Sequence, residues 1–206
     1  MTAQVAAYAI RFARGEFTLN EEVPRFTEHE LAQARMGNPQ ALTALVRAHQ
    51  RSVYSLALRM LGLKDLAEDL AQDVFMQLNR NLQSIESSAH LAFWLRKVTA
   101  FKAIDQLRRR RRLPTTPLDE EMHLCSDANV GDPLLHRHLE RLLEELSPPA
   151  RAVLLLRYQE DLDPTEIART LAMPINTVKS HLKRSLQLMR QKTPGALVAR
   201  PEDQST

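Results

Sequence analysis

The chain is poor in several residue types, and each shortage narrows what the protein can be. One cysteine, Cys125, stands among 206 residues, so no disulfide can form within the chain and a reducing, cytoplasmic setting is expected. Glycine supplies 5 residues and aromatic side chains 5%, whereas 44% of the residues are hydrophobic, so the core must be mainly aliphatic. No apolar run is long enough to span a bilayer, and the N-terminus lacks the apolar block of a signal peptide. We therefore expect a cytoplasmic protein without a membrane-inserted segment.

The fold class follows from the spacing of the apolar residues. They recur at helical intervals throughout, and no convincing run alternates as a β-strand would. We predict an all-α protein with two small helical domains, at 27–112 and 134–192. The stretch between them, 113–133, holds three prolines, five acidic residues and no basic residue, which is typical of a flexible linker. Residues 1–26 and 193–206 are expected to form a poorly ordered extension and tail.

Local signals predict where the helices of the first domain begin and end. A threonine or aspartate followed three residues later by glutamate is a capping-box pattern, and it occurs at 27–30 and again at 65–68. Gly37 and Gly62 suit the left-handed turn that follows a helix. Residues 81–90 are polar and rich in turn formers, so they should form a loop that ends in serine caps before the next helix.

The helix expected over about 89–112 combines aromatic and basic side chains. Positions 96–112 hold eight basic residues against one acidic residue, Asp105, which is a difference of +7 within 17 residues. With Trp94 and Phe101, this favours phosphate contacts beside stacking surfaces, the pairing that binds single-stranded nucleic acid. Two simpler interpretations stay open, because the arginines can be a solvated helix end favoured by the helix dipole and Trp94 can be a core residue.

A second informative stretch, 163–190, is typical of two helices joined by a tight turn. Asp163 can cap the first helix, with Pro164 at its first position and Glu166 three residues after the cap. Pro174 should stop that helix, because a helical proline clashes with the carbonyl four residues before it. The pattern predicts a helix-turn-helix, and an ordinary helical hairpin with a solvated face is the alternative.

The second helix of this pair has one apolar and one basic side. Asn176 or Thr177 can cap it. The side chains expected to face inward are Ile175, Val178, Leu182, Ser185, Leu186 and Met189. The opposite face carries Lys179, Ser180, Lys183, Arg184 and Arg190, with no acidic residue among them. A helix that enters the DNA major groove needs this combination, so we predict duplex DNA binding here.

Evidence for an enzyme is weak. Asp69 and Asp73 lie four residues apart on one helix face and could hold Mg²⁺, but no third partner is evident and an exposed acidic face is far commoner. His136 and Glu140 share a face, which is also too little for a site. No glycine-rich phosphate loop and no recognisable Ser/His/Asp arrangement occurs. We predict no catalytic residue, no metal site and no cofactor.

Taken in order, these parts resemble the bacterial sigma factors of the sigma-70 family, in particular the extracytoplasmic-function (ECF) class. Three segments carry the resemblance: EDLAQDVF at 68–75, FWLRKVTAFKAIDQLRRRRR at 93–112, and the longer stretch 146–185. The first resembles the family's helix that docks on the β′ clamp of RNA polymerase. The second resembles the segment that engages the −10 promoter element, and the third resembles the domain that reads the −35 element.

The resemblance implies a transcription initiation factor that binds core RNA polymerase at its β′ clamp and β flap. It would meet promoter DNA as duplex at −35 and as single strand at −10, assist melting, and catalyse nothing. An anti-sigma factor is implied as a further partner. The alternative is a two-domain helix-turn-helix regulator that binds DNA without polymerase. Such a regulator has no need of outward-facing Asp69, Gln72 and Asp73.

The resemblance assigns three sets of contacts. Those to the polymerase core fall on Asp69, Gln72, Asp73 and Phe75. Those to −10 DNA fall on Asn81, Ser84, Trp94, Arg96, Lys97, Phe101, Lys102, Arg108, Arg109 and Arg110. Those to −35 DNA fall on Thr165, Thr177, Lys179, Ser180, Lys183 and Arg184.

Two departures from the family pattern affect these expectations. Phe101 stands where many relatives have asparagine, and it cannot make the hydrogen bonds of that amide, so −10 specificity cannot be carried over from relatives. Ala172 and Asn176 replace glycines that are common in the turn. Asparagine tolerates left-handed geometry, whereas alanine is strained there.

Overall fold

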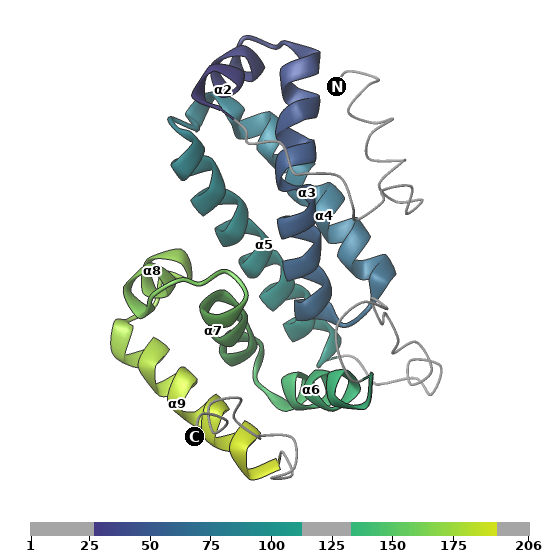
Figure 1. The fold of residues 1–206 in the computed structure, drawn as a ribbon, viewed down its shortest axis with the longest axis vertical. Coiled ribbons are helices and arrows are strands. Elements are labelled where there is room, and N and C mark those ends of the chain that lie inside the picture. The colour runs from purple at the N-terminus through teal and green to yellow at the C-terminus, as the bar shows by residue number, and fades with distance from the viewer. Residues whose placement is uncertain (1–26, 113–132, 193–206) are drawn as a thin grey trace, which may run out of the picture. The chain divides into compact units, whose positions relative to one another are not determined.

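A computed structural model describes residues 27–112 and 133–192 of the chain, the side chains of 133–137 excepted (Figure 1). Every regular element of these residues is a helix, which confirms the all-α prediction. The expectations for the N-terminal extension, for Cys125 and most of the linker, for the His136 side chain and for the tail lie outside the described residues.

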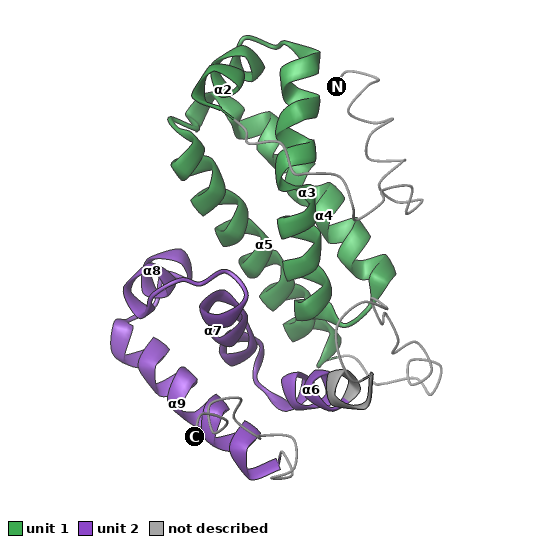
Figure 2. Cartoon of the chain, viewed as in Figure 1, with its two compact units in different colours: residues 1–124 green, residues 125–206 purple. Residues whose placement is uncertain are grey.

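The chain divides into two compact units, residues 1–124 and 125–206 (Figure 2). The helices of unit 1 are α2 (Glu28–Arg35), α3 (Pro39–Leu61), α4 (Lys64–Asn81), the short 3₁₀ helix η1 (Leu82–Ser84) and α5 (Ser88–Arg110). The helices of unit 2 are α6 (Pro133–Glu145), α7 (Pro148–Tyr158), α8 (Pro164–Thr170) and α9 (Ile175–Lys192).

Helix α2 has the ends that its sequence predicts. The backbone N–H of Thr27 donates to Glu30 Oε2 at 2.7 Å, and the backbone N–H of Glu30 donates to Thr27 Oγ1 at 3.3 Å, which confirms the capping box. At the other end Gly37 has φ +85°, and its N–H donates to the carbonyl of Ala34 at 3.0 Å. The N–H of Asn38 reaches back to the carbonyl of residue 33, also at 3.0 Å, so the helix ends in a Schellman motif.

The capping box expected at 65–68 is wrong. Helix α4 begins at Lys64, and its N-cap Leu63 makes no side-chain hydrogen bond. Leu63 is buried and follows the left-handed Gly62, so burial of a leucine fixes this helix start rather than a polar cap. Glu68 instead lies 3.8 Å from Lys64 Nζ, measured to its Oε1.

The loop expected over 81–90 is shorter than predicted. Helix α4 continues to Asn81 and the 3₁₀ helix follows directly, because Leu82 and Ile85 are buried and hold this stretch against the core. The serine cap is confirmed, since Ser87 Oγ accepts the backbone N–H of His90 at 3.1 Å.

The core of unit 1 lies where α3 packs against α2, α4 and α5. Its largest fully buried side chains are Leu31, Leu45, Leu56, Met60, Val74, Leu78, Ile85 and Leu91. Each leucine or methionine buried in this way contributes about 1.5–3 kcal/mol to folding. Because these side chains come from all four α-helices of the unit, α4 and α5 are held side by side, with one face of each turned to solvent.

Unit 2 is built around α7, which packs against α8 and α9. Leu146, Ala150 and Leu154 form a buried cluster, and α9 covers it with Leu182, Leu186, Leu188 and Met189. Val178 and Ser185 of α9 are buried as well, which confirms most of the predicted inward face. Ile175 is the exception: as the first residue of α9 it has no preceding turn to cover it, and 37% of its surface is exposed.

The turn between α8 and α9 does not use its proline as predicted. Helix α8 ends at Thr170, before Pro174 is reached, and Ala172 adopts φ +49°. The N–H of Ala172 donates to the carbonyl of residue 169 at 3.4 Å, and the N–H of Met173 to that of Ala168 at 3.0 Å. This is a Schellman motif in which alanine replaces the usual glycine.

The start of α9 also differs from the expectation. The carbonyl of Pro174 accepts the N–H of Thr177 at 2.9 Å and that of Val178 at 3.2 Å, so the cap position is Pro174. Asn176 and Thr177 therefore lie inside the helix and do not cap it. Buried Val178 fixes the rotation of α9, and this turns residues 176 and 177 outward.

Candidate functional site

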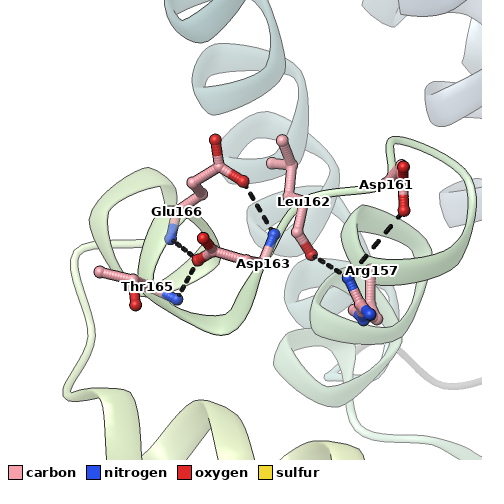
Figure 3. Close-up of polar contacts among 6 residues, drawn as sticks. All are labelled: Arg157, Asp161, Leu162, Asp163, Thr165 and Glu166. Atoms are coloured by element: carbon pink, nitrogen blue, oxygen red, sulfur yellow. Dashed lines mark hydrogen bonds and ion pairs between the residues drawn. The ribbon is translucent and has the colours of Figure 1, made fainter.

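The entry to the helix-turn-helix is held by a compact set of polar contacts (Figure 3). Asp163 Oδ1 accepts the N–H groups of Thr165 at 2.6 Å and Glu166 at 2.8 Å, and Glu166 Oε2 accepts the N–H of Asp163 at 2.8 Å. These contacts confirm the predicted capping box. They lower the pKa of Asp163, chiefly through the hydrogen bond from the N–H of Glu166.

The same entry is tied back to α7. Arg157 Nη1 donates to the carbonyl oxygen of Leu162 at 3.1 Å and lies 4.0 Å from Asp161 Oδ1, as Figure 3 shows. Asp161 adopts φ +51°, which an aspartate tolerates better than most residues. The chain between α7 and α8 is therefore held at three successive residues, and this fixes how α8 presents the turn and α9.

The outer face of α9 carries the cationic side chains that its sequence predicts. Lys179, Lys183 and Arg184 are all exposed, and none of them forms an ion pair within the described residues. Thr177 and Ser180 of α9 are exposed as well, and Thr165 is exposed on α8. All six residues assigned to −35 contacts therefore lie exposed on unit 2.

Ser180 and His181 affect the hydrogen bonding and the charge of the outer face of α9. The hydroxyl of Ser180 donates to the carbonyl of Asn176 at 2.8 Å, so in the free protein its oxygen is presented mainly as an acceptor. His181 is half-buried, and burial, followed by the charge of Arg184, lowers its pKa. The imidazole is therefore neutral at pH 7 and adds no charge to the three cations.

Helix α5 of unit 1 exposes its aromatic and basic residues to different degrees. Phe101 is exposed, as are Arg108 and Arg109, whereas Trp94 is half-buried. Arg109 Nη2 forms an ion pair with Asp105 Oδ2 at 2.7 Å, so part of the basic run is neutralised within the helix.

Arg96 does not join the outward face of α5. It is half-buried and lines a cavity of about 160 Å³ between α3 and α5, together with His49, Ser52 and Thr99. Burial, followed by the charge of Arg96, lowers the pKa of His49. Arg96 and Phe101 are five residues apart and hence point to different sides of the helix. The structure therefore places Arg96 on a different side of α5 from Phe101, against the cavity.

The polar residues of the segment between α4 and α5 are held locally. Asn81 Nδ2 donates to the carbonyl of Gln77 at 2.7 Å, and Ser84 Oγ donates to the carbonyl of Asn81 at 2.7 Å. Both residues are exposed. Their oxygen atoms face solvent on a segment that is anchored by buried Leu82 and Ile85.

Fewer of the assigned side chains of α4 face solvent than the sequence indicates. Asp69 and Asp73 are exposed and Gln72 is half-buried, but Phe75 is a core residue with 9% of its surface exposed. Glu68 is turned toward the protein, and burial raises its pKa. Little of the Phe75 ring is therefore open beside Asp69 and Asp73, and its assignment to a polymerase contact stays a prediction.

One contact that the sequence does not reveal links α4 to α5. Lys102 Nζ donates to Asp73 Oδ2 at 3.2 Å, so a residue assigned to polymerase contact is paired with a residue assigned to DNA contact. They are 29 residues apart, and no local pattern indicates the pairing. The exposed Ile175 was also missed, although its position at the first turn of a helix is a signal for exposure.

The described residues hold no group of three or more His, Cys, Asp or Glu side chains that could bind a metal ion. Over the same residues, no helix is both long enough and apolar enough to cross a membrane.

A separate unit with an acid-free basic helix, joined to a unit with an aromatic and basic helix, defines a two-domain protein of the nucleic-acid-binding class. Two family models specify it further: sigma-70 region 2 matches residues 45–113, and sigma-70 region 4 matches residues 136–189. The chain belongs to the sigma-70 family and is of the ECF type.

Its relatives carry the same description. The ECF RNA polymerase sigma factor SigE of Mycolicibacterium smegmatis is 34% identical over 152 residues, which are 71% of this chain and 59% of that protein. The ECF RNA polymerase sigma factor SigW of Bacillus subtilis is 27% identical over 177 residues, which are 78% of this chain and 93% of that protein. The chain thus spans little more than half of the first relative and nearly all of the second.

Solved structures share the fold. The sigma factor RpoE of Bartonella quintana, crystallised with the anti-sigma factor NepR, matches with a TM-score of 0.62 and 20% identity, over 78% of this chain and 99% of that one. CnrH in complex with the cytosolic domain of CnrY matches with a TM-score of 0.58 and 20% identity, over 81% and 96% of the two chains.

Proposed function

We propose that this protein is an ECF transcription initiation factor that binds core RNA polymerase, directs it to promoters with −35 and −10 elements, and assists their melting. The observation that carries the proposal is the match of regions 2 and 4, in that order, to the two units. The factor acts by binding in the cytoplasm and performs no catalysis itself. A regulator that binds DNA without polymerase is not favoured, because unit 1 would then lack a role.

Polymerase docking is assigned to the exposed part of α4. Asp69 and Asp73 lie four residues apart and both face solvent, so together they offer two carboxylates to basic groups of the β′ clamp. Half-buried Gln72 lies between them in sequence and can add an amide contact. Phe75 adds little to this surface because its side chain is buried. A contact of unit 2 with the β flap completes the proposed docking.

DNA at −35 is assigned to the outer face of α9. Lys179, Lys183 and Arg184 supply three exposed cations that form no ion pair with the part of the chain that the structure describes, on a helix that can enter the major groove. The arginine can form two parallel hydrogen bonds to a guanine edge, whereas the lysines suit phosphates. Thr177 and Ser180 of α9 add short hydroxyl contacts, and exposed Thr165 at the start of α8 adds another.

DNA at −10 is assigned to α5 and to the segment before it. Lys97, Lys102 and the arginines of 108–110 attract the strand, and Asn81 and Ser84 offer polar groups on an anchored segment. Trp94 is half-buried, so only part of its side chain is open to the strand. Arg96 is assigned a place in the cavity wall rather than a DNA contact.

An anti-sigma factor is proposed as a further partner. The support is that the sigma factor RpoE, which has the same fold, was co-crystallised with the anti-sigma factor NepR, and that CnrH, also of this fold, is known in complex with the cytosolic domain of CnrY. The prediction is a protein that binds this chain and prevents holoenzyme formation.

The experiment that tests the function is transcription in vitro with purified cognate core polymerase. The wild-type protein should form a holoenzyme and start transcripts from a limited set of genomic promoters. Asp69→Lys should weaken holoenzyme formation at least tenfold while leaving duplex −35 DNA binding unchanged. Glu86→Lys is the matched control, since Glu86 is also an exposed acidic residue of unit 1 but lies outside α4. Failure of the wild type to form a holoenzyme would refute the proposal.

A further inference from the structure

One polar side chain at the start of α9 is not used by the fold. Asn176 is the second residue of this helix, it is exposed, and it does not cap the helix. The hydroxyl of Ser180 donates to the backbone carbonyl of Asn176 at 2.8 Å, which does not engage the side-chain amide. That amide makes no hydrogen bond to any residue that the structure describes, so its donor and its acceptor are both available to a partner.

The rotation of α9 directs this amide away from the protein. Val178 and Ser185 have 0% and 1% of their surfaces exposed, so they define the inner side of the helix. At about 100° per residue, Asn176 lies about 160° around the helix axis from Val178. Exposed Lys183 follows seven residues later on the same side, about 10 Å along the axis. Asn176 therefore projects from the middle of the outer face that is proposed to meet −35 DNA.

The place of Asn176 along the helix suits contact with a base. In helix-turn-helix docking, the N-terminal residues of the second helix contact base edges in the major groove. Asn176 lies in that first turn, whereas Lys183 and Arg184 lie about two turns further along. An asparagine side chain is short, so its amide reaches a base edge only where the helix backbone comes close to the groove floor, and the inserted first turn is that place.

We propose that Asn176 reads one adenine of the −35 element, with its Oδ1 accepting from the N6 amino group and its Nδ2 donating to N7. Adenine presents this donor and acceptor side by side in the major groove, whereas guanine presents two acceptors there. The inference rests on the proposed function and adds a specificity-determining residue to the −35 site. Glycine, which is common at this position of the turn in the family, has no side chain that could make the contact, so the preference should be particular to this chain.

The test uses the full-length chain in a holoenzyme with its core polymerase, on promoter DNA whose −35 segment is randomised. Bound sequences are selected and counted for the wild type and for Asn176→Ala. The wild type should prefer adenine at one position by about 5- to 150-fold, the range for one bidentate pair. Asn176→Ala should lose the preference at that position alone. Alanine is a better helix former than asparagine, so the variant should fold.

A modified base and a control variant connect the preference to the amide. Replacing the selected adenine by 7-deazaadenine removes the N7 acceptor, so wild-type binding should weaken about 2- to 10-fold, as expected for one lost hydrogen bond. Binding by Asn176→Ala should not change on this substitution. Gln187→Ala is the matched control, because it removes another exposed amide from the same side of α9, about three turns further along. It should keep the wild-type adenine preference.

The outcomes separate the two proposals. If the wild type forms no holoenzyme, the function itself is refuted and the inference falls with it. If the holoenzyme forms and Asn176→Ala retains the wild-type preference at every −35 position, the reading of a base by Asn176 alone is overturned. If Asn176→Ala weakens binding to all sequences equally, the amide contacts a phosphate, and the inference is again wrong while the function stands. Loss of a preference for a base other than adenine would also overturn it.

Discussion

Replacing Ala172 by glycine tests the physical basis of the turn that presents α9. Ala172 has φ +49°, a left-handed conformation in which its Cβ crowds the following carbonyl oxygen, at a cost of about 1–2 kcal/mol. Glycine removes this cost but has more freedom in the unfolded chain, which offsets about 0.4–1 kcal/mol. Both Schellman hydrogen bonds, from the N–H groups of Ala172 and Met173, stay available to the variant. The net expectation is a stabilisation of unit 2 by about 0.5–1 kcal/mol.

Hydrogen exchange is the suitable assay, because it reports the local stability of α8 and α9 separately from unit 1. Amides of these helices should exchange more slowly in Ala172→Gly, and a thermal transition of unit 2 should rise by about 2–8 °C. The matched control is Ala168→Gly, four residues earlier within α8, which should destabilise by about 0.5–1 kcal/mol because glycine weakens a helix interior. If the two variants shift exchange in the same direction, the left-handed geometry is not what limits this turn.

Three further predictions concern single contacts. The Asp73–Lys102 pair joins an exposed carboxylate to a half-exposed lysine, so a double-mutant cycle with Asp73→Asn and Lys102→Met in the free protein should give a coupling of about 0.2–1 kcal/mol, and no coupling would dismiss the pair. Arg184→Ala should cost about 1–3 kcal/mol in −35 binding and relax the preference at one base pair, whereas an equal loss on all sequences would make it a phosphate contact. The pKa of Asp163 is lowered from 3.8, so the charged cap stabilises unit 2 above pH 3.8. This stabilisation is lost as the pH falls below 3.8 and the carboxylate is protonated. Asp163→Asn should therefore make the free energy of unfolding of unit 2 depend less on pH in this acidic range.

The helix caps show how far local patterns can be trusted. The boxes at Thr27 and Asp163 formed as predicted, because each satisfies its orphan N–H groups with side chains within three residues. The pattern at Asp65 is equally good in sequence but was not used. There the preceding Leu63 is buried, and burying a leucine is worth more than one exposed polar cap.

Contacts between elements explain the other differences between the predicted and the observed surroundings of side chains. A helical period groups Ile175 with the inward residues of α9, but the period carries no information on whether a neighbouring element reaches the helix end. The same limit applied to Phe75, whose family match indicates a surface role while the packing of α3 against α4 encloses its ring. Pairing between Lys102 and Asp73 depends on two helices meeting, which no local pattern contains.

The side chains of the two proposed DNA-binding helices suit different states of DNA: those of α9 suit duplex DNA, and those of α5 suit melted DNA. A paired base exposes only its edges, and edges are read by donors and acceptors such as those of Arg184 and Ser180 on α9. An unpaired base also exposes its faces, and a face is bound by a ring such as Phe101 on α5. A stacking residue on α5 therefore gains contact only after the strands separate, whereas α9 gains its contact before. The stacking part of the binding energy from unit 1 is then available only to melted DNA, so this part favours melting over mere attachment to the duplex.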